Sequence, residues 1–463
     1  MKTRGQFAAI RKAASPEWIV VRAFAFAILL GTLLLCLPWA NRRSEWTDPL
    51  TALFTATSAT CVTGLTVVDT GSFFTLFGQT VVLLLIQAGG LGIMTLGTFL
   101  LILTGRRLDI EDEFVLMDSL GYDRIRGLPS LLRRTILFTV LLEGAGAVIL
   151  AHRLYAAHNL PLGTAAWHGL FHAVSAFCNA GFALQADSLV SFRDDPVILL
   201  TISALLILGG LGFLVLHDLS SIRFWRRNLI TRGRLSLHTK VVLKTTAILI
   251  AGGWILITLL EWNHTLAGLS APTRFLTSFF HAVTPRTAGF NAVDMTLFHP
   301  ATLFLTMILM FIGGSPGSTA GGIKTTTLAI LCRVTFAITR GRAAVESHGR
   351  TISQKVISEA LSIFLLGAVL VICAFLALLI IESPPLLVKG CSRADELLFE
   401  TVSAFGTVGL STGITASLSA AGKLIIMLVM FVGRVGPLTL ALIVGRRAVQ
   451  QATRLPEEEL IVG

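Results

Sequence analysis

The sequence predicts an all-α integral membrane protein with four M1–pore loop–M2 repeats around a pseudo-fourfold central pore, where M1 and M2 are membrane-spanning helices. Two observations predict this fold. The chain is 54% hydrophobic and only 14% charged, with a mean hydropathy of +0.79, a composition typical of bilayer proteins. In addition, one glycine-containing segment occurs four times, about 110 to 120 residues apart. The segments begin at Phe54, Phe171, Phe280 and Phe399.

Each repeat supplies two apolar runs of about 20 residues, the length that spans a bilayer. The predicted spans are Trp18–Pro38, Thr75–Leu103, Thr135–His152, Val197–Leu216, Val241–Glu261, Ala301–Ile338, Ile357–Ile381 and Leu424–Val444. The net charge of +11 gathers in the gaps between repeats and at the two ends, and the positive-inside rule places these parts in the cytoplasm. The repeated segments therefore open from the external side. This distribution also disfavours nucleic-acid binding.

These spans divide the chain into units. We expect a cytoplasmic tail at 1–16, repeats at 17–122, 123–230, 231–345 and 346–452, and a C-terminal tail at 453–463. The six cysteines form no CxxC pair and no cluster with histidine, so neither a disulfide framework nor a zinc site is indicated.

A helix-compatible stretch too short to span the bilayer precedes each repeated glycine. These predicted pore helices are Pro49–Ala59, Gly163–Phe177, Pro272–Thr284 and Ala394–Phe405. Non-helical backbone at membrane depth must be buried in protein or line a cavity. Each short helix and the strand after it therefore predict a re-entrant pore loop.

The residues that end at each glycine share no side-chain chemistry. They are Cys61, Val62, Thr63 and Gly64; Cys178, Asn179, Ala180 and Gly181; Arg286, Thr287, Ala288 and Gly289; and Gly406, Thr407, Val408 and Gly409. Because none is a carboxylate, the shared main-chain carbonyls are the expected ligands. Carbonyl rings replace the hydration shell of a monovalent cation, and glycine permits the backbone angles required. The sequence thus predicts a potassium filter and no catalytic residue.

The second span of each repeat is rich in glycine near its midpoint. In the first two repeats we favour close helix packing, at Gly89–Gly92 and Gly209–Gly212. In the third repeat we expect a broken helix that lines the cavity as a gate. This gate consists of Gly313, Gly314, Ser315, Pro316, Gly317, Ser318, Thr319, Ala320, Gly321 and Gly322.

Arg434 is an ionisable side chain in the middle of the last span. Such a residue usually faces the bundle interior, where its charge would repel cations below the filter. We therefore add it to the gate. The neighbouring Gly317–Lys324 does not match a phosphate-binding loop, because Ile323 separates Gly322 from Lys324.

Polar residues flank the loops on both sides of the glycines. Asp69, Asp187 and Asp294 follow them by five or six positions. These acids either form an outer mouth that concentrates cations or tie each loop to its own pore helix; both interpretations stay open. Within the pore helices, Thr55, His172, His281 and Glu400 occupy equivalent positions. For these we favour packing and hydrogen bonding over metal binding or proton transfer.

Together, the four loops, the segment IGGSPGSTAGGIKTTT from Ile312 and the C-terminal LIVG resemble the Trk/Ktr/HKT superfamily of potassium transporters, most closely its KtrB branch. The resemblance covers roughly the whole chain and implies potassium uptake across the bacterial inner membrane. It also implies a third-repeat gate and an arginine below the filter, at Arg434. One departure is Thr284-Pro285, where the family has Ser-Ala; we expect only a local effect.

The same resemblance implies partners and cofactors. It implies a homodimer, into whose partner protomer Leu460–Gly463 packs, and a cytoplasmic ring of KtrA type that binds the nucleotide. No cofactor is expected in this chain, and membrane lipids surround it. Sodium as an activating or coupled ion, and channel-like flux versus symport, are left open.

Other functions fit the sequence less well. A sodium or sodium-coupled cation transporter of the same architecture is the alternative that we retain. A voltage-gated channel needs a helix with regularly spaced arginines, and inverted repeats would open their loops on alternating sides. A membrane enzyme is disfavoured because no catalytic constellation is visible.

Overall fold

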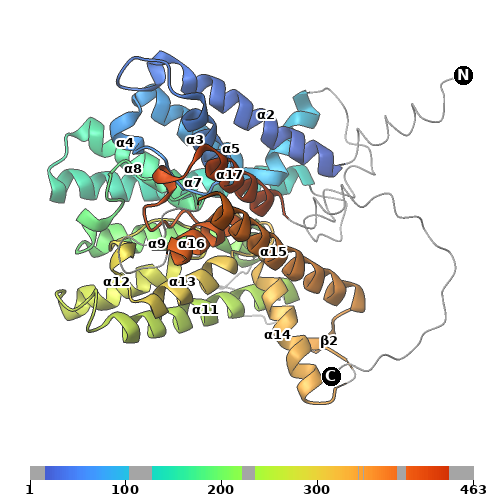
Figure 1. Ribbon diagram of the computed structural model, residues 1–463. Coiled ribbons are helices and arrows are strands. Elements are labelled where there is room, and N and C mark those ends of the chain that lie inside the picture. Colours follow the sequence, from blue (N-terminus) through green and yellow to red (C-terminus); the bar gives the residue numbers. More distant parts are fainter. Residues whose placement is uncertain are drawn as a thin grey trace, which may run out of the picture.

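The computed structural model describes residues 16–103, 128–221, 235–342, 344–347, 349–382 and 393–436. Within these ranges the regular elements are helices, apart from one two-stranded hairpin. The order of long helix, short helix, extended segment and long helix occurs four times (Figure 1). The predicted all-α fold is confirmed.

The first two repeats occupy the blue and green parts of Figure 1. Their elements are α2 (Pro16–Cys36), η1 (Pro38–Ala40), α3 (Pro49–Thr60), α4 (Thr70–Phe73), α5 (Leu76–Leu103), α7 (Leu128–His158), α8 (Leu162–Phe177), η2 (Val190–Phe192), α9 (Pro196–Leu211) and α10 (Phe213–Ser221).

The third and fourth repeats occupy the yellow to red parts. Their elements are α11 (Leu237–Glu261), α12 (Ala271–Val283), η3 (Met295–Leu297), α13 (Pro300–Phe311), α14 (Thr325–Thr339), β1 (Glu346–Ser347), β2 (Arg350–Thr351), α15 (Gln354–Ile381), α16 (Arg393–Gly406), η4 (Thr415–Ser417) and α17 (Ala420–Val435). All four predicted pore helices, now α3, α8, α12 and α16, agree with the structure to within one residue at each end.

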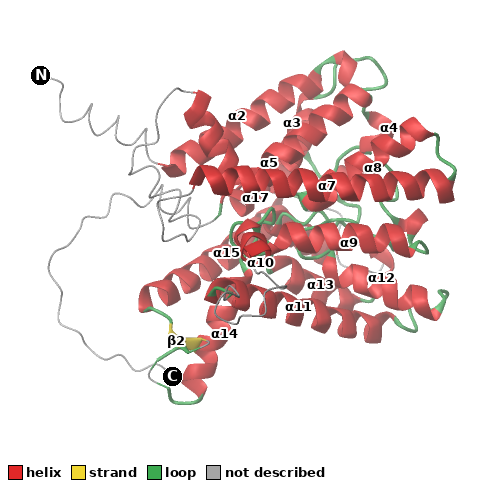
Figure 2. Cartoon of the chain, turned by 180° about the vertical axis from the view of Figure 1, so that it is seen from behind, coloured by secondary structure: helices red, strands yellow, loops and turns green. Residues whose placement is uncertain are grey.

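The repeats close into a ring through one recurring contact, in which the M2 helix of each repeat packs against the pore helix of the next. α5 contacts α8, α9 contacts α12, α13 contacts α16, and α17 returns to α3. Figure 2 shows α7, α9 and α11 running side by side along the ring. This cyclic order gives the four loops a common axis.

The first residue of each repeated segment anchors its pore helix in the core. Phe54, Phe171, Phe280 and Phe399 are at most 1% exposed. The residue after each glycine is buried to the same extent, at Leu65, Phe182, Phe290 and Leu410. Each loop is therefore fastened by apolar side chains on both sides of its glycine, while its backbone stays free of side-chain cover.

Several described helices have the length and composition of membrane spans. They are Arg133–His158, Leu237–Glu261 and Gln354–Ile381, and the pair Pro196–Leu211 and Phe213–Ser220 is a fourth if it counts as one span bent by 98°. Shorter apolar helices occupy Val20–Cys36, Leu76–Gly92, Pro300–Phe311 and Thr325–Thr339. The predicted span Leu424–Val444 begins within α17 and continues beyond the described residues.

Our expectation for the M2 helices of the first two repeats was wrong in one respect, because glycine packs these helices and also breaks them. A Cβ on Gly89 or Gly209 would collide with the carbonyl that ends the adjacent pore helix, as it would on Gly433. Three residues further on, the helix breaks. Positive φ angles of 64°, 87° and 98° occur at Gly92, Gly212 and Gly436.

Polar contacts join the outer end of M1 to the start of M2. Glu261, at the end of α11, accepts a hydrogen bond from the backbone N–H of His299 at 3.0 Å. Glu382, after α15, accepts one from Ser419 at 3.0 Å. His299 and Ser419 are N-cap residues of α13 and α17, so these acids lie where the N–H groups and dipole of a helix favour negative charge.

The second repeat reverses this arrangement, since its acid lies on M2. Asp195 caps α9 by accepting from the N–H of Val197 at 3.0 Å. It also accepts from Arg153 Nε at 2.7 Å and lies 3.0 Å from His158 Nε2, both on α7.

The domain boundaries predicted above stay a prediction, and the tail Leu460–Gly463 lies outside the described residues.

We predict that Asp195→Asn destabilises the protein, because Asp195 is buried and its charge is shared by a helix cap and two basic groups. A hydrogen-bonded charge contributes about 2 kcal/mol, so the midpoint of thermal unfolding in detergent should fall. The matched control is Asp194→Asn, since the Asp194 side chain is 70% exposed and should leave the midpoint unchanged. Equal unfolding midpoints for the two variants would show that the hydrogen bonds of Asp195 with α9 and α7 do not stabilise the protein.

Candidate functional site

All four pore helices end in the same left-handed turn. The residue two positions before each glycine has a positive φ, although none is glycine, and the glycine itself has a φ between 70° and 90°. These residues are Val62, Asn179, Thr287 and Thr407. A left-handed non-glycine residue is uncommon, and such strain gathers at functional sites.

Backbone hydrogen bonds hold each turn against the helix that precedes it. The N–H of Thr63 donates to the carbonyl of Ser58 at 2.8 Å. The corresponding bonds join Ala180 to Ser175, Val408 to Ser403, and Ala288 to Thr284. The third loop is one residue shorter between hydroxyl and glycine, yet it keeps the same bond. The departure at Thr284-Pro285 is therefore local, as expected.

Hydroxyl groups at these positions also bind the strand that follows the turn. Ser58 Oγ and Ser403 Oγ each accept from the N–H of their repeat's glycine at 3.1 Å. Ser175 Oγ donates to the carbonyl of Phe182 at 2.8 Å, and Thr284 Oγ1 donates to that of Phe290 at 2.6 Å. One hydroxyl per repeat thus fixes the strand beyond its helix.

The four glycines form a closed ring of backbone contacts. A Cβ on Gly181 would lie 2.8 Å from the carbonyl oxygen of Ala288 in the next repeat. Equivalent contacts would be still closer at the other three positions, between Gly64 and Ala180, Gly289 and Val408, and Gly409 and Thr63. Each contact therefore reaches the next repeat, and the fourth returns to the first. No side chain fits in this ring.

The ring carbonyls are buried and lack hydrogen-bond donors. Thr63, Ala180, Ala288 and Val408 are fully buried, and within the described part of the chain none of their carbonyl oxygens accepts a hydrogen bond. Buried carbonyls are almost always paired, so four unpaired ones that face a common axis are poised for a ligand without hydrogen atoms. A dehydrated monovalent cation is such a ligand.

The broken third helix lies directly below this ring. After α13, residues 312–324 leave the helical path before α14 begins. The N–H of Gly313 donates to Ile323 at 2.9 Å, which closes the base of the loop. A Cβ on Gly321 would meet the side chain of Thr407, and Thr319 Oγ1 donates to the carbonyl of Phe177 at 3.1 Å. The loop therefore touches Thr407 of the fourth pore loop and the end of the second pore helix at Phe177.

The loop is also fastened to the break in the second repeat. Ser315 N–H donates to the carbonyl of Gly210 at 3.0 Å, and Phe213 N–H donates to that of Gly317 at 3.0 Å. The Ser315 hydroxyl adds a bond to Gly210 at 2.9 Å. The carbonyls that α9 leaves free where it ends at Gly212 thus find partners in the loop.

Two cations hold the loop carbonyls. The Arg434 guanidinium donates to the carbonyls of Thr319 and Gly89, and Lys324 Nζ donates to that of Ala320 at 2.7 Å. Arg434 is only 7% exposed. Among the described residues, no carboxylate lies within ion-pair distance of either cation. In this part of the chain, the hydrogen-bond acceptors of both cations are neutral backbone carbonyls.

The acidic residues beyond the filter cap local turns. Asp69 accepts from Ser72 N–H at 2.8 Å and Asp294 from Thr296 N–H at 2.9 Å. Asp187 accepts from Ser191 N–H at 2.9 Å. Each of these bonds leads to the turn that follows the acid. The interpretation in which the acids tie each loop to its own pore helix is therefore wrong for these bonds. The outer-mouth role stays a prediction.

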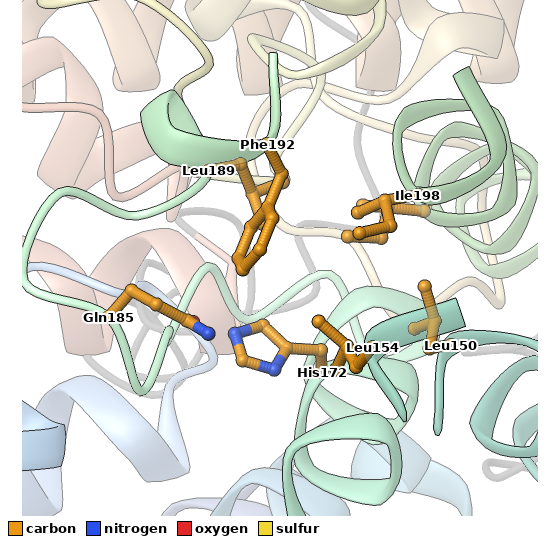
Figure 3. A pocket seen from close by; sticks show the side chains of 8 residues that line it. Leu150, Leu154, His172, Gln185, Leu189, Phe192 and Ile198 are labelled. Carbon is orange, nitrogen blue, oxygen red and sulfur yellow. The ribbon is translucent and has the colours of Figure 1, made fainter. Parts of the chain in front are cut away.

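Three of the four polar pore-helix residues hydrogen-bond the outgoing strands, and Thr55 instead donates to the carbonyl of Thr51 in its own helix at 2.9 Å. His172 Nε2 accepts from the N–H of Leu184, and His281 Nε2 accepts from that of Ala292, both at 3.4 Å. Glu400 accepts from Ser411 Oγ at 3.0 Å. Figure 3 shows the His172 ring facing Gln185, at the edge of a cavity of about 10 Å³ that apolar side chains complete.

Sequence reasoning missed the role of Lys324, which it considered only as part of a failed phosphate-loop motif. A lysine directly after a glycine-rich break inside an apolar segment was the available signal, since such a charge needs a partner at membrane depth. It also missed the single-glycine breaks at Gly92 and Gly212. The glycines were noticed, but the same glycine pattern is expected for a continuous, closely packed helix and for a broken one. The sequence therefore does not reveal their left-handed backbone angles.

Comparison with known proteins gives a consistent result. The family described as TrkH, cation transport protein, matches residues 9–452. The potassium/sodium uptake protein NtpJ of Enterococcus hirae is 38% identical over 457 residues, which cover 98% of each chain. The Ktr system potassium uptake protein B of Bacillus subtilis is 39% identical over 452 residues, 97% of each chain.

A solved structure supports the fold. The crystal structure of the potassium transporter TrkH from Vibrio parahaemolyticus aligns with a TM-score of 0.69 and 19% sequence identity, covering 90% of this chain and 84% of that one. At this identity the likeness concerns the fold alone. With the family match over nearly the whole chain, the closed ring of glycine loops and the full-length relatives, this chain belongs to the TrkH family of cation transport proteins.

Proposed function

We propose that this protein takes up potassium across the bacterial inner membrane through a carbonyl-lined filter. The observation that carries the proposal is the ring of four buried carbonyls without hydrogen-bond donors, closed by four glycines. The names of its relatives point the same way, since Ktr system potassium uptake protein B shares 39% identity over 97% of the chain. The family consists of transport proteins and not of enzymes.

The filter consists of the four stretches that end at Gly64, Gly181, Gly289 and Gly409, with the backbone as ligand. Side chains in these stretches point into protein, where for example the Asn179 amide and the Thr287 hydroxyl hydrogen-bond at 3.2 Å. Potassium is the ion that a ring of neutral carbonyls favours. Sodium is the second candidate, because the relative NtpJ is named a potassium/sodium uptake protein.

The gate consists of the loop Gly313–Gly322 together with Arg434. Support comes from the contacts of this loop with Thr407 and Phe177 and from the bond between Arg434 and Thr319. In this conformation the loop lies under the filter, and the Arg434 guanidinium holds it there through its bond to Thr319. Opening requires that the loop carbonyls exchange these bonds for other partners.

The finer cellular assignments follow the same reasoning. We place both termini in the cytoplasm, since basic residues gather there. Relatives named as parts of a Ktr system support a protein that works with further subunits. The homodimer and the cytoplasmic nucleotide-binding ring of KtrA type rest on the sequence resemblance. The deciding experiment for the function is uptake of potassium, rubidium and sodium into liposomes that contain only this protein.

We predict that Gly289→Ser lowers the preference for potassium over sodium by roughly tenfold, equal to ~1.4 kcal/mol of differential binding. The new side chain would collide with the carbonyl of Val408 in the ring. Ion preference in liposome uptake measures the effect.

Gly413→Ser is the control for this prediction. Gly413 has a φ of 93°, similar to the 77° of Gly289, but has nothing within 4 Å of a Cβ. It suffers the same backbone strain without touching the ring, so its ion preference should equal that of wild type. The filter assignment fails if Gly289→Ser and Gly413→Ser behave alike.

We predict that Arg434→Ala raises potassium flux several-fold, because it removes both a positive charge from a poorly hydrated cavity and the bond that holds Thr319. Shortening the loop between Gly313 and Gly322 should raise the flux further. Arg434→Lys keeps the charge but loses the double donor, so its flux separates repulsion from tethering. Reduced flux in a folded Arg434→Ala protein would show that the residue supports conduction instead.

A further inference from the structure

A buried acidic residue lies in the middle of a membrane helix, outside the filter and the gate. Glu143 is at the centre of α7 and is 7% exposed, whereas the neighbouring Val140 and Leu141 are 60% and 58% exposed. In the described part of the chain no basic group lies within ion-pair distance of it. Burial of a carboxyl group at membrane depth is costly, so its position calls for a functional reason.

Glu143 contacts the first residue of the second filter stretch. Its Oε1 lies 3.7 Å from Cys178 Sγ, and Gln87 Oε1 on α5 lies 3.6 Å from the same sulfur. The thiol is the donor in both contacts and has one proton to give. The Cys178 sulfur therefore lies behind the filter between Gln87 of the first repeat and Glu143 of the second, and these three side chains form a triangle that joins the two repeats.

Cys178 has no freedom to leave this triangle. It is fully buried, and a Cβ on Gly90 of α5 would lie only 2.5 Å from its sulfur. The backbone after it enters the left-handed turn at Asn179, and the following carbonyl, of Ala180, belongs to the ring. A displacement of the Cys178 side chain is therefore passed to the ring within two residues.

The other repeats lack this support. The residues equivalent to Cys178 are Cys61, Arg286 and Gly406. Among the described residues none of these contacts an acidic side chain; Arg286 contacts the Thr246 hydroxyl at 3.4 Å, and glycine has no side chain. The carboxyl group therefore acts on one of the four stretches only.

We propose that Glu143 is a positioning residue for ion selectivity, which sets the Cys178 side chain through direct contact and thereby the Ala180 carbonyl. It does not touch the ion. This inference rests on the proposed filter, since it assumes that the carbonyl ring selects the ion. It adds a residue from outside the repeated segments to the groups that determine specificity.

The test compares Glu143→Ala and Glu143→Gln with the matched control Thr139→Val in liposome uptake of potassium, rubidium and sodium. Thr139 lies one turn earlier on the same buried face of α7, and its hydroxyl has no hydrogen-bond partner among the described residues, so the control should keep the wild-type preference. Loss of one hydrogen bond near the filter should lower the potassium-to-sodium preference of Glu143→Ala about fivefold. Glu143→Gln should retain it, because an amide oxygen still accepts from the Cys178 thiol.

A second variant keeps the inference testable if Glu143→Ala does not fold. Cys178→Ala removes the contact from the other side and should reproduce the shift, and in the double variant the two shifts should not add. Wild-type preference in Cys178→Ala, or in a folded Glu143→Ala protein, overturns the positioning role. Failure of the proposed filter looks different, because then wild type itself shows no preference among the three ions.

Discussion

The contact between each ring glycine and a carbonyl of the next repeat is the constraint on which the rest of this structure depends. Hydrogen at the place of a side chain lets four backbones approach so closely that a Cβ could not be accommodated. Such an approach buries the carbonyls of Thr63, Ala180, Ala288 and Val408 without giving them donors. The arrangement is stable when something other than a hydrogen bond satisfies these oxygens, and a bare cation does so.

The helices serve this ring at two levels. At the level of the filter, each M2 helix packs against the next pore helix, and glycines such as Gly89 and Gly209 let it approach the end of that repeat's own pore helix. One turn further on, the helices break at Gly92 and Gly212. The breaks free carbonyls, and the loop Gly313–Gly322 and Arg434 use those of Gly210 and Gly89. Packing and breaking are thus two uses of one glycine-rich midpoint.

The sequence was sufficient for the parts of the structure that depend on composition and repetition. Pore helices agreed to within one residue because the repeated glycine, such as Gly64, limits where each helix can end, and in the first and third repeats a proline, such as Pro49, lies in the first turn. The broken third span was predictable because its polar, glycine-rich content excludes a continuous membrane helix. The break at Gly212 was not predictable, because a single glycine in an apolar helix fits either close helix packing or a left-handed backbone angle. The contact of Glu143 with Cys178 joins residues 35 positions apart and follows from the tertiary fold, which no local pattern encodes.

The fourfold pattern is regular in the glycine ring and irregular below it, and under the proposed function this difference separates selection from gating. Selection needs equal ligands on all sides, and all four loops keep the same turn. Gating needs an element that can leave the axis, and a symmetric ring of rigid helices has none. Among the described residues only the third repeat inserts a long loop, yet that loop contacts Phe177 and Gly210 in the second repeat and Thr407 in the fourth. Arg434 then extends the same connection to Gly89 in the first repeat. Because one loop and one guanidinium join all four repeats below the ring, a rearrangement of either changes contacts in every repeat, including the contact with Thr407 next to the ring carbonyl of Val408.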